Sequence, residues 1–72
     1  MKKEIVEALK KHAIAHIEKH KMNVEIYLNY SVGVGEHGDV MDTIEKELNA
    51  IAEYHDQLEV LNTYFTDDLL NP

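Results

Sequence analysis

Hydrophobic and polar residues follow a helical period over two long stretches of the chain. In residues 2–29, apolar side chains recur three or four positions apart, and lysines and glutamates occupy the opposite side. Apolar positions at this spacing lie on one face of an α-helix. The pattern therefore predicts a long amphipathic helix over residues 2–29. The residues expected on its apolar face are Ile5, Leu9, Ala13, Val24 and Tyr27, with Val6 and Ile17 beside them.

The pattern returns over residues 39–62, with alternating steps of three and four residues. Such steps are the spacing of a seam between two packed helices. We expect the carboxylate of Asp39 to cap the start of this second helix by accepting from first-turn amides. Residues 63–72 are expected to form a short turn or a tail. The seam positions are Met41, Ile44, Leu48, Ile51, Leu58 and Asn62, with His55 between Ile51 and Leu58.

The connecting segment, residues 30–38, contains GVGEHG, which has the G-x-G-x-x-G spacing of a dinucleotide-binding loop. Such a loop needs a strand before it and further strands in a parallel sheet, and residues 24–30 and 58–65 have some strand propensity. However, 72 residues leave no room for the remaining strands, and Glu36 would place a negative charge where phosphate should bind. The glycines are expected to permit a tight connection between helices. The predicted fold is therefore an all-α antiparallel hairpin in a single domain.

A hairpin of this size buries one seam and leaves flanking apolar residues in water, among them Val6, Ile17, Ile26 and Leu28. The chain has no cysteine, so neither disulfides nor thiolate metal sites can stabilise it. We therefore predict a homodimer, as an antiparallel four-helix bundle. No apolar run reaches the roughly 20 residues of a membrane helix, and the N-terminus lacks the apolar core of a signal peptide. The expectation is a cytoplasmic protein without membrane contact.

The net charge of −7 is distributed unevenly along the chain. Residues 1–30 contain six lysines and four glutamates, whereas residues 31–72 contain ten acidic residues and Lys46 alone. The chain has no arginine and no basic patch, which argues against nucleic-acid binding. No nucleophile with an obvious partner accompanies the loop acids, so we expect no catalytic site and no enzyme activity. The acidic half suits a partner with a basic surface. The candidate interaction residues are Glu36, His37, Asp39, Asp42, Glu45, Glu53 and Asp56.

Three histidines lie on the apolar side of the first helix. His12, His16 and His20 are four residues apart and therefore stack along the helix, while His55 takes a seam position in the second. In a hairpin whose facing residue numbers sum to about 71, His16 faces His55. One interpretation is a set of polar layers that fix the register through hydrogen bonds, for example to Tyr54. The other is a site for a divalent transition metal such as zinc. Its ligands would be His16, His20 and His55, with His12 or Glu47 as further candidates.

A resemblance covers most of the chain, from HAIAHIEKH to the YHDQL run at residues 54–58. In these features the chain resembles a family of small uncharacterised proteins encoded by tailed cyanophages, the marine myoviruses. The resemblance implies a phage protein made in a bacterial cytoplasm, and it implies no activity. The residues that carry it are His16, His20, Asn23, Gly33, Gly35, Glu36, His37, Tyr54, Asp56, Gln57 and Leu58.

These observations favour a non-enzymatic protein–protein interaction module that engages a host or phage protein. A metal-binding helical bundle that uses the histidines on its apolar face is the alternative. A mimic of nucleic-acid charge would need acids along a long continuous face. Asp42, Glu45, Glu53 and Asp56 share one side of the second helix, but they form only a short stripe.

Overall fold

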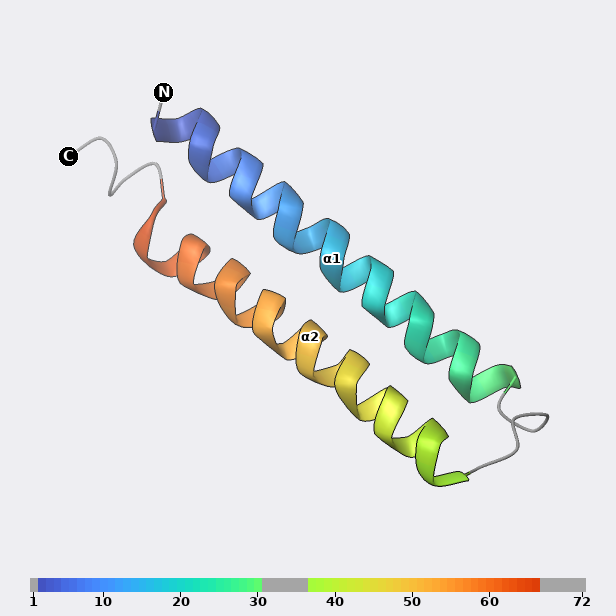
Figure 1. Cartoon of the computed structure of the whole chain (residues 1–72). Helices are drawn as coiled ribbons and strands as arrows, with labels where there is room; N and C mark the ends of the chain where they lie inside the picture. Colours follow the sequence, from blue (N-terminus) through green and yellow to red (C-terminus); the bar gives the residue numbers. More distant parts are fainter. Residues whose placement is uncertain (1, 31–36, 67–72) are drawn as a thin grey trace.

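The computed structural model describes residues 2–30 and 37–66, and they form two helices. Helix α1 spans Lys2–Tyr30 and helix α2 spans His37–Tyr64, within two residues of the predicted boundaries (Figure 1). Residues 24–30 and 58–64 are helical, and the described segments contain no strand, so the alternative of a dinucleotide-binding fold is excluded. The glycine connection at 31–36 and the turn expected within 67–72 lie outside the described residues.

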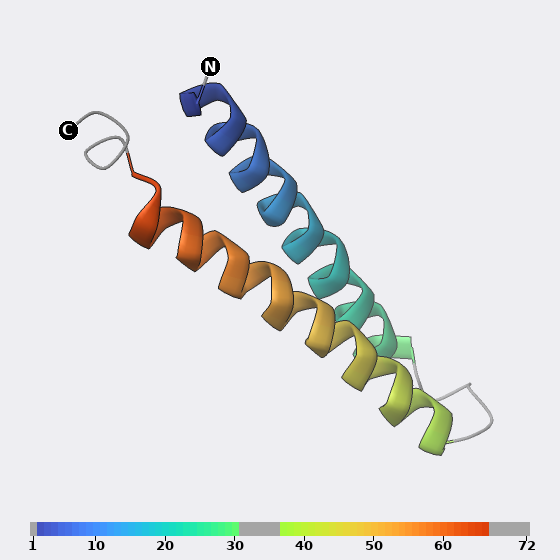
Figure 2. The ribbon, with the colours of Figure 1, turned by 60° about the vertical axis from the view of Figure 1, so that its left-hand side comes forward.

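The two helices lie antiparallel and side by side along their length, as the two views show (Figures 1 and 2). The molecule measures 56 × 14 × 13 Å, and its radius of gyration is 16.4 Å. A compact domain of this length would have a radius of gyration of roughly 11 Å. The all-α antiparallel hairpin predicted from the sequence is therefore confirmed, in the form of an extended rod. Neither helix, over its described length, is apolar enough to cross a membrane.

The interior of the rod is narrow. Only Val6, Ala13 and Val40 are buried hydrophobic residues among those described, and Ala13 is the most enclosed at 1% exposure. A methyl side chain at this position lets the two backbones approach closely. On α1 the inner face is completed by half-buried Ile17, Val24 and Tyr27 together with His16 and His20.

The apolar face of α1 differs in part from the predicted one. Ile5 and Leu9 were expected in the seam but remain 53% and 49% exposed, whereas Val6 is buried. The sequence pattern predicted that Val6 lies beside the seam and is exposed to solvent. Ile26 and Leu28 are exposed, as predicted. Ala13, Val24 and Tyr27 lie on the inner face as predicted, so the difference is concentrated in the first turns of the helix.

Helix α2 is rotated about its own axis relative to the orientation that the sequence pattern predicted. Met41 and Leu48 are 67% and 50% exposed, and His55 and Asn62 are exposed as well. The positions one residue earlier take their place: Val40 is buried, and Glu47, Tyr54 and Leu61 are half-buried. The remaining predicted seam residues, Ile44, Ile51 and Leu58, are half-buried. One half of the predicted seam therefore packs against α1, and the other half faces solvent.

The start of α2 also differs from the prediction. The helix begins at His37, so Asp39 lies within its first turn and is not the capping residue. Its backbone carbonyl accepts a hydrogen bond from Thr43 Oγ1 at 2.7 Å. An acidic side chain in the first turn is still favoured there, because the helix dipole is positive at this end. At the other end, the Phe65 amide donates to the Leu61 carbonyl at 3.0 Å.

Candidate functional site

A column of aromatic rings lies between the helices. It consists of His12, His16 and His20 from α1 and Tyr54 from α2. The ring centroids of His12 and His16 are 4.3 Å apart, and those of His16 and His20 are 6.0 Å apart. Tyr54 stacks on His16 at 4.4 Å with an interplanar angle of 15°. The four-residue spacing in α1 produces the column, and one tyrosine from α2 covers it.

Glu47 is the polar centre of the layer next to the column. Its Oε2 accepts a hydrogen bond from His20 Nδ1 at 2.5 Å, and Asn23 Nδ2 donates to Oε1 and Oε2 at 3.2 and 3.3 Å. The hydrogen bond from His20 lowers the pKa of Glu47 most, and the bond from Asn23 and the positive charges of His20 and Lys19 lower it further. Partial burial acts in the opposite direction. Glu47 is therefore ionised near neutral pH and can only accept hydrogen bonds.

His16 lies at the centre of the column and lacks a polar partner for one nitrogen. Its Nδ1 is buried and has no hydrogen-bond partner. Burial lowers the pKa of His16, and the positive charges of His12, Lys19 and His20 lower it further. Both effects disfavour the imidazolium, so the ring is held in its neutral form near neutral pH.

The structure brings together some of the predicted ligands and separates another. His12, His16 and His20 lie in one column, and Glu47 contacts His20. His55 is exposed on α2, and the residue that stacks on His16 is Tyr54. Among residues 2–30 and 37–66, no group of three or more His, Asp or Glu side chains is placed to hold a metal ion.

Two residues of the site have roles that the sequence did not indicate. Tyr54 was expected to hydrogen-bond to the histidines, but its ring stacks on His16 and His20 and meets His12 edge-on. Asn23 was not expected in the site at all. Its position three residues after His20 could have indicated this role, because that spacing places both residues on the same side of α1.

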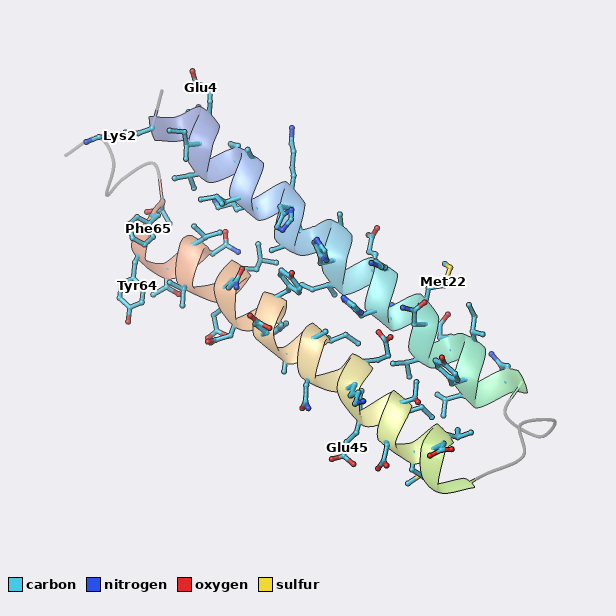
Figure 3. All side chains as sticks on the ribbon, viewed as in Figure 1. Lys2, Glu4, Met22, Glu45, Tyr64 and Phe65 are labelled. Atoms are coloured by element: carbon cyan, nitrogen blue, oxygen red, sulfur yellow. The ribbon has the colours of Figure 1, made fainter. Side chains whose placement is uncertain are left out.

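Hydrophobic side chains remain exposed on both helices. Leu9 and Val60, 49% and 40% exposed, line a groove of about 260 Å³ between the helices, together with His12, Asp56, Gln57 and Leu61. Figure 3 shows Tyr64 projecting from the end of α2, Phe65 just after it, and Met22 pointing away from α2. The large exposed hydrophobic residues are Ile5, Leu9, Ile14, Met22, Ile26, Leu28, Met41, Leu48, Val60, Tyr64 and Phe65.

The acidic candidates on α2 are exposed. Asp42, Glu45, Glu53 and Asp56 share the side of α2 that faces away from α1, and Figure 3 shows Glu45 projecting outward. Asp42 and Glu45 line a shallow hollow with Lys46 and Asn49. Asp39 is also exposed, in the first turn. Glu36 and the side chain of His37 lie outside the described part of the chain.

No protein-family model matches the chain, and neither a curated protein nor a solved structure matches it. The origin implied by the resemblance to cyanophage proteins stays a prediction. The case for function therefore depends on the geometry and chemistry of the two helices.

Proposed function

We propose that this protein is a non-enzymatic interaction module. Two hairpins associate through their exposed apolar residues into an antiparallel four-helix bundle. The outer acidic side of each α2 then binds a partner protein with a basic surface. The observation that carries this proposal is the seam of α2, of which the hairpin uses only one half.

The unused half of the seam supports association. Met41, Leu48, His55 and Asn62 repeat every seven residues along α2, which is the spacing for packing against another helix. The hairpin's own interface leaves these positions exposed, with Met41 at 67% and Leu48 at 50%. A second helix beside this stripe would give α2 a partner on both halves of its seam.

The exposed area supports the same conclusion. The chain exposes 5716 Å². A compact monomer of its mass would expose roughly 4,600 Å². The extended rod therefore has enough surface for an interface in which each partner buries about 800 Å².

The opposite net charges of the two helices favour a dimer in which α1 of one chain packs beside α2 of the other. Helix α1 carries six lysines and four glutamates, while α2 carries seven carboxylates and one lysine. In an antiparallel four-helix bundle with each α1 beside the α2 of the partner, every neighbouring pair joins a net positive helix to a net negative one. Packing α2 against α2 would place like charges together.

The acidic side of α2 is left open by such a dimer. Asp42, Glu45, Glu53 and Asp56 are exposed on the side of α2 opposite α1, and Glu45 borders the stripe that contains Met41 and Leu48. Four carboxylates over about four helical turns produce a negative surface that attracts a lysine- or arginine-rich partner. Surface charges of this kind set the rate and the salt dependence of association.

The first experiment measures mass by sedimentation equilibrium over a range of micromolar concentrations. A dimer is expected. Gel filtration alone is unsuitable because a rod 56 Å long elutes earlier than a compact protein of equal mass. A folded monomer at these concentrations would refute the bundle.

The second experiment tests the acidic surface. The chain is immobilised and host lysate is passed over it at low salt, with a variant in which Asp42, Glu45, Glu53 and Asp56 are replaced by their amides. The matched control replaces Glu7, Glu18 and Glu25 of α1 by glutamine. A protein retained by the wild type and by the control, but released by the α2 variant and by added salt, is the expected result. Equal retention by both variants would contradict the assignment of the surface.

A further inference from the structure

The histidine column has no role in the proposed association. The contact of His20 with Glu47 resembles the way proteins prepare an imidazole for a metal ion. Ligating histidines usually donate their other ring N–H to a carboxylate, which fixes the tautomer and the orientation of the ring. In this protein Glu47 occupies that carboxylate position, and Asn23 holds Glu47 in turn.

The protonation state of His20 Nδ1 follows from its partner. An ionised carboxylate can only accept, so His20 Nδ1 carries the hydrogen in its 2.5 Å bond to Glu47 Oε2. In the neutral ring the lone pair is then on Nε2. This nitrogen is a good ligand for zinc, copper or nickel. Glu47 thus acts as the residue that orients the ligand, which differs from the ligand role predicted from the sequence.

His16 supplies a second imidazole one helical turn away. The two rings lie on the same side of α1, because the residues are four positions apart. The buried Nδ1 has no partner, so no existing hydrogen bond opposes a change in the orientation of the ring. The centroids of His16 and His20 are 6.0 Å apart. Two imidazoles that bind one ion tetrahedrally at about 2.0–2.1 Å have centroids roughly 5 Å apart, so binding requires the two rings to approach by about 1 Å while Tyr54 is stacked on His16.

We propose that His16 and His20 form a two-imidazole site for a divalent transition ion, with Zn²⁺ as the reference ion, and that Glu47 and Asn23 hold His20 in its ligating orientation. Water completes the coordination, since the described residues place no third ligand there. His12 is tilted against His16, with ring centroids 4.3 Å apart and planes at 57°. We leave it out of the ligand set because Glu47, the carboxylate that orients an imidazole, contacts His20. The exposed His55 takes no part.

The test is isothermal titration calorimetry of the untagged full chain with ZnCl₂ near neutral pH, after treatment with chelator and its removal. Binding of one ion per chain is expected. His16→Ala and His20→Ala should each abolish it, and His55→Ala and His12→Ala should leave it unchanged. Glu47→Gln keeps both imidazoles but should weaken binding about 10- to 100-fold, as loss of an orienting carboxylate does in other metal sites. Circular dichroism verifies that each variant is folded.

Several outcomes would overturn the proposal. No heat of binding from the wild type at millimolar zinc would remove the site. Loss of binding in His12→Ala but not in His20→Ala would move it to the other histidine pair. Full affinity in Glu47→Gln would show that the carboxylate does not orient His20. Nitrogen-15 spectra of the imidazoles give an independent readout, because zinc should shift His20 Nε2 and leave His20 Nδ1 protonated. The site lies within one hairpin, so its failure would leave the test of dimerisation unaffected.

Discussion

Leu48 gives the sharpest test of whether the open half of the α2 seam is an interface. Replacing it by glutamine removes the apolar side chain and largely retains helix propensity. In a lone hairpin Leu48 is 50% exposed, so the change should lower stability by at most about 0.8–1.5 kcal/mol, through the half that is already covered. In a dimer, the exposed half of the side chain becomes buried on each of the two chains.

The expected magnitude follows from that exposure. Full burial of a leucine side chain contributes about 1.5–3 kcal/mol, so the half that is still exposed contributes about 0.8–1.5 kcal/mol per chain. Two chains lose about 1.5–3 kcal/mol per dimer in Leu48→Gln. Each 1.4 kcal/mol is a tenfold change, and the dimer dissociation constant should therefore rise roughly ten- to hundredfold.

Sedimentation equilibrium on the wild type, Leu48→Gln and Met22→Gln measures this constant. Met22 is the matched control, because it is 61% exposed and points away from α2 in Figure 3. Its replacement removes a similar apolar side chain from the opposite side of α1. If both variants dissociate at the same protein concentration, the seam of α2 is not the interface, and the reasoning from its spacing is refuted.

Two further predictions concern the hairpin itself. Ala13→Leu should lower the free energy of unfolding by about 1–3 kcal/mol in urea titrations through overpacking, whereas Ala15→Leu, at an exposed position, should be nearly neutral. In metal-free protein, acidification should destabilise the fold, because the folded pKa values of His16 and Glu47 lie below their ordinary values of 6.5 and 4.5, so the unfolded chain binds protons first. Urea midpoints should therefore fall below about pH 6.5 and again below about pH 4.5. In His16→Gln, the decrease of the urea midpoint below about pH 6.5 should disappear, and the decrease below about pH 4.5 should remain. If the decrease below about pH 6.5 is unchanged, protonation of His16 is not its cause.

The hairpin could be predicted from the sequence because its signals are local. The helical period runs through both segments without a breaker, and the boundaries of α1 and α2 fall close to the predicted positions. The face that each helix turns inward was harder to predict. Two neighbouring stripes on α2 repeat every seven residues, one through Val40 and Tyr54 and the other through Met41 and Leu48. Periodicity alone does not distinguish them.

The prediction placed Met41, Leu48, His55 and Asn62 in the seam, and the structure turns the neighbouring stripe of Val40, Glu47, Tyr54 and Leu61 inward. The reason lies in partners that are far apart in sequence. Glu47 lies 27 residues from His20 and 24 from Asn23, and only the inward rotation lets it bond to both. The same rotation places Tyr54 on His16 and moves His55 to the surface. A pattern of hydrophobic positions contains no information about such polar pairing, so the predicted site included His55 and assigned Tyr54 a hydrogen bond.

The antiparallel arrangement has a mechanical consequence. The beginning of α1 and the end of α2 lie at the same end of the rod, as both views of the ribbon show (Figures 1 and 2). A force applied between these ends separates the helices layer by layer, as in a zipper, and each layer bears the load alone. The hairpin should therefore open gradually at low force. In the layer where Glu47 joins His20 and Asn23, such a force must also break hydrogen bonds between the helices. Pulling from the connecting end and one terminus would instead load all layers at once and require a larger force.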